Sequence, residues 1–120
     1  MRTAEAVKTN VREKYAEIAL QSKEQNATSC CGVGTNGTYT IMADSYASLS
    51  GYNPEADLGL GCGLPTEFAQ IYEGDTVIDL GSGAGNDCFV ARAQTGAEGK
   101  VIGIDFTPEM IRRARQNAEK

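Results

Sequence analysis

Two patterns of apolar and polar residues divide the chain. Near the N-terminus, apolar residues recur every three or four positions: Val7, Val11, Tyr15 and Ile18. This spacing places them on one face of a helix, so we predict an amphipathic helix over residues 3–25. Two short apolar runs follow much later, at 77–80 and 101–104. Runs of this kind, separated by a helical pattern, predict parallel β-strands that are buried on both faces.

The stretch between these patterns is irregular. Residues 27–63 are rich in Gly, Ser, Thr and Asn and hold three of the four cysteines. Within them we expect an Asn36–Gly37 turn and a short helix around Asp44–Leu49. Pro65 then predicts the start of a short helix that runs to Tyr72, since proline is tolerated in a first turn. We divide the chain into an N-terminal helical and irregular part, 1–63, and the start of a nucleotide-binding domain, 64–120.

The second part has a strand–helix–strand–helix order. A Gly74–Asp75 turn precedes the first strand, and the crossover helix begins at Asn86 or Asp87 and ends near Thr95. Thr107 is expected as the N-cap of the last helix, with Pro108 in its first turn. This order predicts an α/β fold with a doubly wound parallel sheet. Two strands alone make a marginal sheet, so we expect an N-terminal fragment of a longer enzyme, or one that completes itself by self-association.

The segment VIDLGSGAG, residues 77–85, carries the main chemical signal. Its glycines Gly81, Gly83 and Gly85 follow a buried strand, where the backbone must turn tightly and let a ligand come close. A dinucleotide fingerprint would need a glycine at position 86, which is asparagine. Asp79 would repel a pyrophosphate but suits a ligand with an ammonium and a sulfonium. The spacing G-x-G-x-G after this acid resembles the first motif of the methyltransferases that use S-adenosylmethionine. We therefore favour that cofactor over a dinucleotide; the remaining alternative is a glycine-rich turn without a ligand.

A second acid supports a ligand at this turn. Asp105 ends the run VIGID, 20 residues after Gly85. In strand–helix–strand nucleotide sites, an acid at the tip of the second strand accepts hydrogen bonds from the ribose hydroxyls. Asp105 fits that role for either cofactor. The alternative is that it only ends the strand and caps the helix that follows.

Composition limits the partners and the compartment. The 120 residues suffice for one small domain, and the formal net charge of -5 argues against nucleic acid. A basic group near the C-terminus (Arg112, Arg113, Arg115 and Lys120) is interpreted as cations that stabilise a helix end. Residues 1–25 are polar and amphipathic, without the apolar region of a secretory signal, and no apolar stretch reaches about 18 residues. We therefore expect no membrane span and a reducing, cytoplasmic compartment.

The cysteines are then expected to be free or ligand-binding. Cys30 and Cys31 are adjacent, and Cys62 lies between two glycines. The chain has no histidine and no C-x-x-C pair, which makes a zinc site a poor match. Soft thiolates from distant segments suit a thiophilic ion; the alternative is that these three are simply exposed thiols. For Cys88 we favour a small buried apolar residue at the helix–sheet interface.

A resemblance to a known family rests on five segments: VREKYAEIA, SCCG, GYNPEADLGLGCGLP, VIDLGSGAGNDC and VIGIDFTPEM. With them the chain resembles the N-terminal part of the arsenite methyltransferases, which methylate trivalent arsenic with S-adenosylmethionine. The resemblance covers nearly all of the 120 residues. It implies a Rossmann-like methyltransferase fold of which this chain holds the first two parallel strands.

The resemblance also implies roles for individual residues. Cys62 and Cys31 would be thiolates that bind arsenite or its thiol conjugate, and Cys30 could replace Cys31. The loop residues Gly81, Ser82, Gly83 and Gly85 would face the methionine end of the cofactor, supported by Asp79. Asp105 would hold the ribose, and Phe106 would lie against the adenine. The arsenic lone pair would attack the sulfonium methyl in line, and a thiol reductant would take part.

Two other functions fit the same residues. The first is a methyltransferase that uses S-adenosylmethionine on a small organic substrate, with incidental cysteines. The second is a non-catalytic chain that acts as a binding or dimerising module. The arsenite family's later cysteines would lie beyond Lys120, so activity of these 120 residues alone is not expected to follow from the resemblance.

Overall fold

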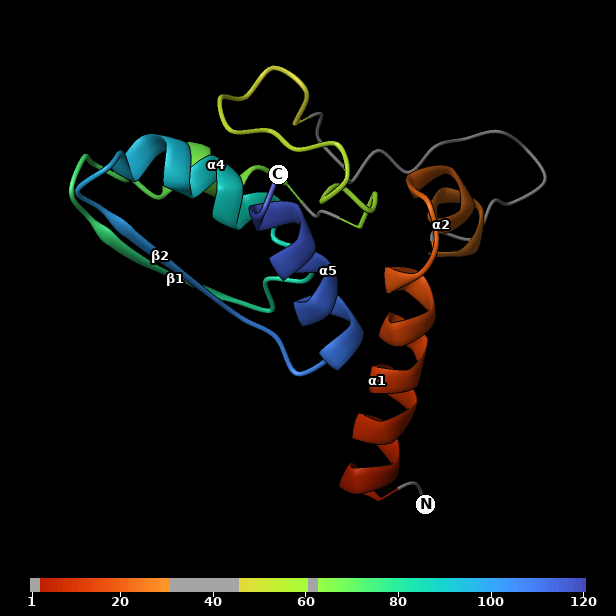
Figure 1. Cartoon of the computed structure of the whole chain (residues 1–120). Helices are drawn as coiled ribbons and strands as arrows, with labels where there is room; N and C mark the ends of the chain where they lie inside the picture. The colour runs from red at the N-terminus through yellow and green to blue at the C-terminus, as the bar shows by residue number, and fades with distance from the viewer. Residues whose placement is uncertain (1–2, 31–45, 61–62) are drawn as a thin grey trace.

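The computed structural model describes residues 3–30, 46–60 and 63–120. Its elements are α1 (Ala4–Ala19), α2 (Lys23–Cys30), α3 (Pro65–Phe68), β1 (Thr76–Leu80), α4 (Asn86–Thr95), β2 (Lys100–Ile104) and α5 (Pro108–Ala118) (Figure 1). The strand–helix–strand–helix order of the second half is as predicted. Among the described residues, no helix combines the length and the apolar character that crossing a membrane requires.

The sheet consists of β1 and β2, which pair in parallel. Val77 lies opposite Val101, and Leu80 lies opposite Ile104. α4 forms the crossover between the strands and packs on one face of the sheet (Figure 1). Because the strands are parallel, the loops that leave their carboxyl ends meet at one edge. The α/β fold class expected from the sequence is therefore confirmed.

The opposite face of the sheet is open. Ile78 is 59% exposed, Leu80 is 77% exposed, and Ile104 is 49% exposed. Alternation along a strand puts Ile78 and Leu80 on the same side, and the register puts Ile104 beside Leu80. The expectation that both strands are buried on two faces is thus wrong for the described residues, because α4 covers only one face.

The expected N-terminal helix is two helices. The backbone N–H of Ser22 donates to the side-chain Oε1 of Gln25 over 2.8 Å, and the N–H of Gln25 donates to Ser22 Oγ over 3.3 Å. This reciprocal arrangement is a capping box, which starts a new helix at Lys23. The prediction of one helix over 3–25 is therefore wrong in its continuity, and residues 27–30, expected to be irregular, belong to α2.

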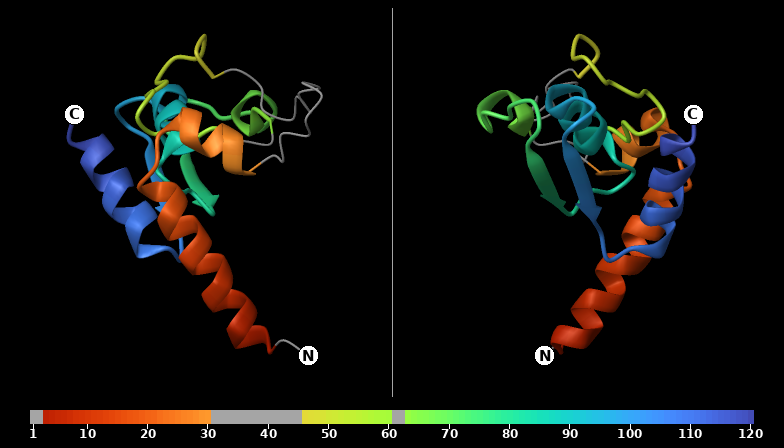
Figure 2. Two further views of the ribbon diagram at one scale, coloured as in Figure 1. Left: turned by 90° about the vertical axis from the view of Figure 1, so that its right-hand side faces the viewer. Right: turned by 60° about the vertical axis from the view of Figure 1, so that its left-hand side comes forward.

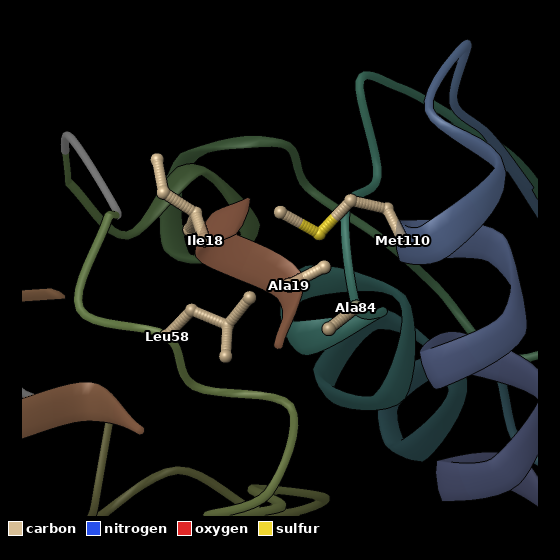
Figure 3. Packing of buried hydrophobic residues seen from close by; sticks show 5 residues of the cluster. All are labelled: Ile18, Ala19, Leu58, Ala84 and Met110. Carbon is tan, nitrogen blue, oxygen red and sulfur yellow. The ribbon is translucent and has the colours of Figure 1, made fainter. Parts of the chain in front are cut away.

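The apolar stripe of α1 is buried only at its end. Val7 and Val11 are exposed, whereas Ile18 and Ala19 are buried. Ile18 and Ala19 join Leu58, Ala84 and Met110 in the hydrophobic core (Figure 3). This core lies between α1, α5 and the loop of residues 81–85, called the glycine loop below. The first turns of α1 extend away from the rest of the chain (Figure 2). The last turns of α1 are therefore the ones that position it beside the glycine loop.

Two short elements differ from their predictions. The backbone N–H of Leu49 donates to Tyr46 O over 2.9 Å, which makes a turn where a helix was expected. Residues 44–45 and the Asn36–Gly37 pair lie outside the described residues. The helix that starts at Pro65 ends at Phe68 instead of Tyr72. Gln70 adopts a left-handed φ of 52°, which cannot continue a helix.

Arg113 has a different role from the one expected. Its Nη1 donates to the carbonyls of Ala19 and Gln21, over 2.6 and 3.0 Å. Ala19 is the last residue of α1 and Gln21 follows its C-cap, so these carbonyls lie where the last acceptors lack intrahelical donors. Arg113 therefore ties α5 to the C-terminus of α1, and this side chain stabilises a neighbouring helix end rather than that of its own helix.

Candidate functional site

The glycine loop turns sharply between β1 and α4. The N–H groups of Gly81 and Ser82 both donate to Ile104 O, over 2.7 and 3.0 Å, which holds the loop against the end of β2. Gly81, Gly83 and Gly85 have φ values of 79°, 54° and 97°. These left-handed conformations favour glycine over any residue with a Cβ. The alternating glycines of the motif thus have a direct conformational cause.

Asp105 connects the glycine loop to the start of α5. Its Oδ2 accepts the Gly83 N–H over 2.9 Å, and its Oδ1 accepts the Thr107 N–H over 2.8 Å. The Thr107 side chain makes no capping hydrogen bond, although Thr107 is the N-cap residue by position. Asp105 therefore helps to cap the start of α5, which was the second of the two interpretations of this residue. Each carboxylate oxygen can still accept a further hydrogen bond from a ligand.

A cavity of about 270 Å³ lies beside this loop. Four of the residues expected at a cofactor line it: Gly81, Ser82, Gly83 and Asp105. Its other walls come from α1, from the segment 46–60, from the start of α4 and from α5, and consist of Tyr15, Tyr46, Ala56, Asp57, Leu58, Leu60, Ala84, Asn86, Asp87 and Met110. Residues far apart in the sequence therefore enclose one space at the carboxyl edge of the sheet.

Three expected cofactor residues do not line this cavity. Asp79 points toward α4, where it accepts a hydrogen bond from Cys88 Sγ over 3.3 Å. Gly85 lies at the start of α4 and lines a neighbouring cleft between α4 and α5. Phe106 is 52% exposed, and the Arg12 guanidinium lies 5.9 Å from its ring centroid. In this structure Phe106 therefore contacts α1 rather than the cavity.

Two carboxylates in the cavity wall were not singled out from the sequence. The first, Asp57, is 5% exposed. Its Oδ2 accepts from Lys23 Nζ over 2.5 Å and from the Tyr52 hydroxyl over 3.0 Å, and its Oδ1 accepts the Gly59 N–H over 3.0 Å. Burial opposes its ionisation, but these hydrogen bonds prevail and hold the pKa of Asp57 below its ordinary value. The cavity wall therefore contains an ionised carboxylate that is paired with the Lys23 ammonium.

The second carboxylate is Asp87, in the first turn of α4. Burial, together with the negative charge of Asp79, raises the pKa of Asp87. Among the described residues, Asp87 Oδ1 and the neighbouring Asn86 Oδ1 are buried acceptors without a hydrogen-bond partner. Both residues line the cavity. Unsatisfied buried acceptors are costly, so this wall suits a ligand that brings N–H or O–H donors and positive charge.

Tyr46 closes the cavity on the side of Asp87. It is 3% exposed, and its hydroxyl donates to Gly63 O over 2.6 Å. Burial and then the charge of Asp87 raise the pKa of Tyr46, so its phenol stays protonated at neutral pH. No local motif marks Tyr46, Asp57 or Asp87, because their role depends on segments that meet only in the folded chain.

Cys88 is a half-buried thiol in the first turn of α4. Burial and the negative charge of Asp79 raise the pKa of Cys88 to about 12, so it is a thiol and not a thiolate at neutral pH. Its contact with Asp79 of β1 lies at the expected helix–sheet interface, but Cys88 is half-buried and also lines the cleft between α4 and α5, so it is not the fully buried residue that was expected. Cys30 is the last residue of α2. Cys31 and Cys62 lie outside the described residues.

Comparison with known proteins gives a consistent family. Residues 71–120 match the model of a methyltransferase domain. The arsenite methyltransferase of Halobacterium salinarum is 42% identical over 99% of this chain and 33% of its own length. That of Aquipseudomonas alcaligenes is 32% identical over 85% of this chain and 28% of its own. That of Mus musculus is 29% identical over 98% of this chain and 30% of its own. No solved structure matches the chain.

These matches bear on both halves of the sequence. The methyltransferase model covers β1, the glycine loop, α4, β2 and α5, and the arsenite methyltransferases match the N-terminal segments as well. The chain spans about a third of the length of the curated relatives it matches. On this evidence, the chain belongs to the arsenite methyltransferase family, and its residues 71–120 match a methyltransferase domain.

Proposed function

We propose that the full-length protein transfers a methyl group from S-adenosylmethionine to trivalent arsenic, and that this chain holds the cofactor. The observation that carries the proposal is the cavity beside the glycine loop, where Asp87 and Asp105 line the wall next to the ion-paired Asp57. A ligand with an ammonium, a sulfonium and ribose hydroxyls complements these walls in charge and in hydrogen-bond donors. A pyrophosphate would meet like charge there.

Each wall has a separate task in this proposal. The loop Gly81–Ser82–Gly83 allows close approach to the methionine end of the cofactor, and Asp105 accepts hydrogen bonds from the ribose. Asp87 and Asn86 offer their unpaired oxygens to the ammonium group. When bound, S-adenosylmethionine supplies the methyl group on a positively charged sulfur. The chain's own contribution is to orient that ligand and to exclude water. Holding the reacting groups in the right geometry lowers the activation barrier of methyl transfer.

The arsenic side of the reaction is assigned to thiols. We propose Cys62 and Cys31 as the thiolates that bind arsenite or its thiol conjugate, with Cys30 as the alternative to Cys31. Soft thiolates suit a soft, thiophilic centre. A thiol reductant would return any disulfide formed among these cysteines to the reduced state. A reducing, cytoplasmic compartment suits free thiols of this kind.

An arsenite methylation assay on the full-length protein tests the proposal. We expect Cys62→Ser to lower the rate of arsenite methylation at least 100-fold, while its affinity for S-adenosylmethionine stays within twofold of the unsubstituted protein. The matched control is Cys88→Ser, because this thiol is a packing residue that a hydroxyl can replace as donor to Asp79. If Cys62→Ser methylates arsenite normally, the arsenic assignment is wrong, and a small organic substrate becomes the better hypothesis.

A further inference from the structure

We propose that Tyr15, on the N-terminal helix α1, is a cofactor-binding residue whose ring closes the cavity over the bound ligand. The inference rests on the proposed use of S-adenosylmethionine. It adds a wall that the glycine motif does not contain. It also makes docking of α1 part of cofactor binding.

The position of Tyr15 follows from the packing of α1. Ile18 is 2% exposed and Ala19 is 3% exposed, and both pack in the core with Ala84 and Met110 (Figure 3). Residues three and four apart share one face of a helix, so Tyr15 continues this buried face by one turn. It therefore lies above the core, at the glycine loop, and it lines the cavity together with Gly83 and Asp105.

Tyr15 is the residue of the cavity wall whose aromatic ring is accessible to a ligand. Tyr15 and Tyr46 are the aromatic residues of the described cavity wall. Tyr46 is almost fully buried, and its hydroxyl is bound to Gly63 O. Tyr15 is 41% exposed, so a ligand in the cavity can bury ring surface that water now covers. Burial of aromatic surface and contact of a ring face with a cation both favour binding.

Phe106 competes for the same role and is less well placed. Its ring faces the Arg12 guanidinium of α1 and lies outside the cavity wall. Arg12 is one helical turn before Tyr15, so one face of α1 covers both Phe106 and the cavity. A ligand ring on the covered face of Phe106 would have to displace Arg12. Tyr15 needs no such displacement.

Binding measurements on the full-length protein test the inference. Calorimetric titration with S-adenosylmethionine and with S-adenosylhomocysteine should give at least tenfold weaker binding for Tyr15→Ala. Tyr15→Phe keeps the ring and should bind within threefold of the unsubstituted protein. The matched control is Tyr72→Ala, which removes an exposed tyrosine from outside the cavity and should bind normally. Thermal unfolding confirms that each variant is folded.

A second readout is independent of the substitutions. Amide hydrogen exchange in the last two turns of α1 should slow at least threefold when S-adenosylmethionine binds. The role of Tyr15 would be overturned by normal affinity of a folded Tyr15→Ala variant, or by α1 exchange rates that do not change when the ligand binds. Either result would leave the proposed function intact. Absence of binding by the unsubstituted protein would overturn the proposed function and this inference together.

Discussion

Asp57 was not predicted as a site residue from the sequence, yet in the structure its carboxylate accepts three hydrogen bonds. It lies in the irregular segment before Cys62, yet it joins Lys23 at the start of α2 to Tyr52 and to the backbone of Gly59. A single buried carboxylate therefore holds the cavity wall against the second helix. Glycine spacing could predict the loop and Asp105, because those residues are neighbours along β1 and β2. It could not predict Asp57, whose charged partner Lys23 comes from a distant helix.

The hydrogen bonds of Asp57 predict a pH-dependent stability. Its pKa is lower in the folded chain than in the unfolded chain, so folding binds fewer protons and stability rises with pH across that interval. The contribution is present above the ordinary aspartate pKa of about 4 and is lost as the pH falls through the lowered value. Asp57→Asn should cost about 1–2 kcal/mol at pH 7, a range that allows for the half-exposed Lys23.

Urea unfolding of the parent and the Asp57→Asn variant between pH 7 and pH 3 measures this contribution. The difference in unfolding free energy should be constant near neutrality and should shrink below about pH 4. Glu55→Gln is the control, because it changes an exposed carboxylate in the same segment whose surface ion pair with Lys120 contributes little to stability. A difference that stays the same down to pH 3 would contradict the assignment.

At the scale of elements, the ends of the helices were harder to predict than their existence. The bounds of α4 and α5 agree with the sequence, because glycine, proline and threonine mark them. The break between α1 and α2 was missed although Ser22 and Gln25 form a recognisable capping box, because the apolar repeat appeared to run on. The early end of α3 had no such sign, since Gln70 is a left-handed residue other than glycine.

Two hydroxyls at helix starts should respond differently to removal. Ser22 Oγ accepts the Gln25 N–H, so Ser22→Ala should lower stability by about 1 kcal/mol. Thr107 Oγ1 is buried without a partner among the described residues, because Asp105 takes the capping role. Thr107→Val keeps the shape and removes a polar group, so it should be neutral or stabilising.

Thermal and urea unfolding of these two variants distinguish the two kinds of helix start. We expect a clear loss of stability for Ser22→Ala and none for Thr107→Val. A loss of about 1 kcal/mol for Thr107→Val would mean that its hydroxyl does cap α5.

At the scale of the whole molecule, the open sheet face is the feature that the sequence misrepresented. The apolar runs of β1 and β2 correctly predicted parallel strands. Their burial on both faces was a further inference from composition, and it depends on what covers the sheet. Here α4 covers one face, and Ile78, Leu80 and Ile104 form an exposed apolar surface on the other. The pattern of apolar residues indicates which side chains are able to be buried. Which of them are buried depends on the elements that pack against the sheet.

This apolar surface predicts self-association of the 120-residue chain. Exposed contiguous apolar patches promote contact between copies, and the parallel strands also leave unpaired edges. Sedimentation velocity should show a mass that rises with concentration, and Leu80→Lys should reduce that rise. Phe68→Lys is the matched control, because Phe68 is at least as exposed but lies on α3. A monomer at all concentrations up to about 100 µM, where such weak contacts are normally detected, would contradict the prediction.

The central claim is that the cavity beside the glycine loop holds S-adenosylmethionine and not a dinucleotide. Parallel calorimetric titrations of the full-length protein with S-adenosylmethionine and with NADH test it most directly. We expect the unsubstituted protein to bind S-adenosylmethionine saturably at one site and not to bind NADH. The Asp105→Ala variant should lose the binding of S-adenosylmethionine. Saturable binding of NADH without binding of S-adenosylmethionine would contradict it.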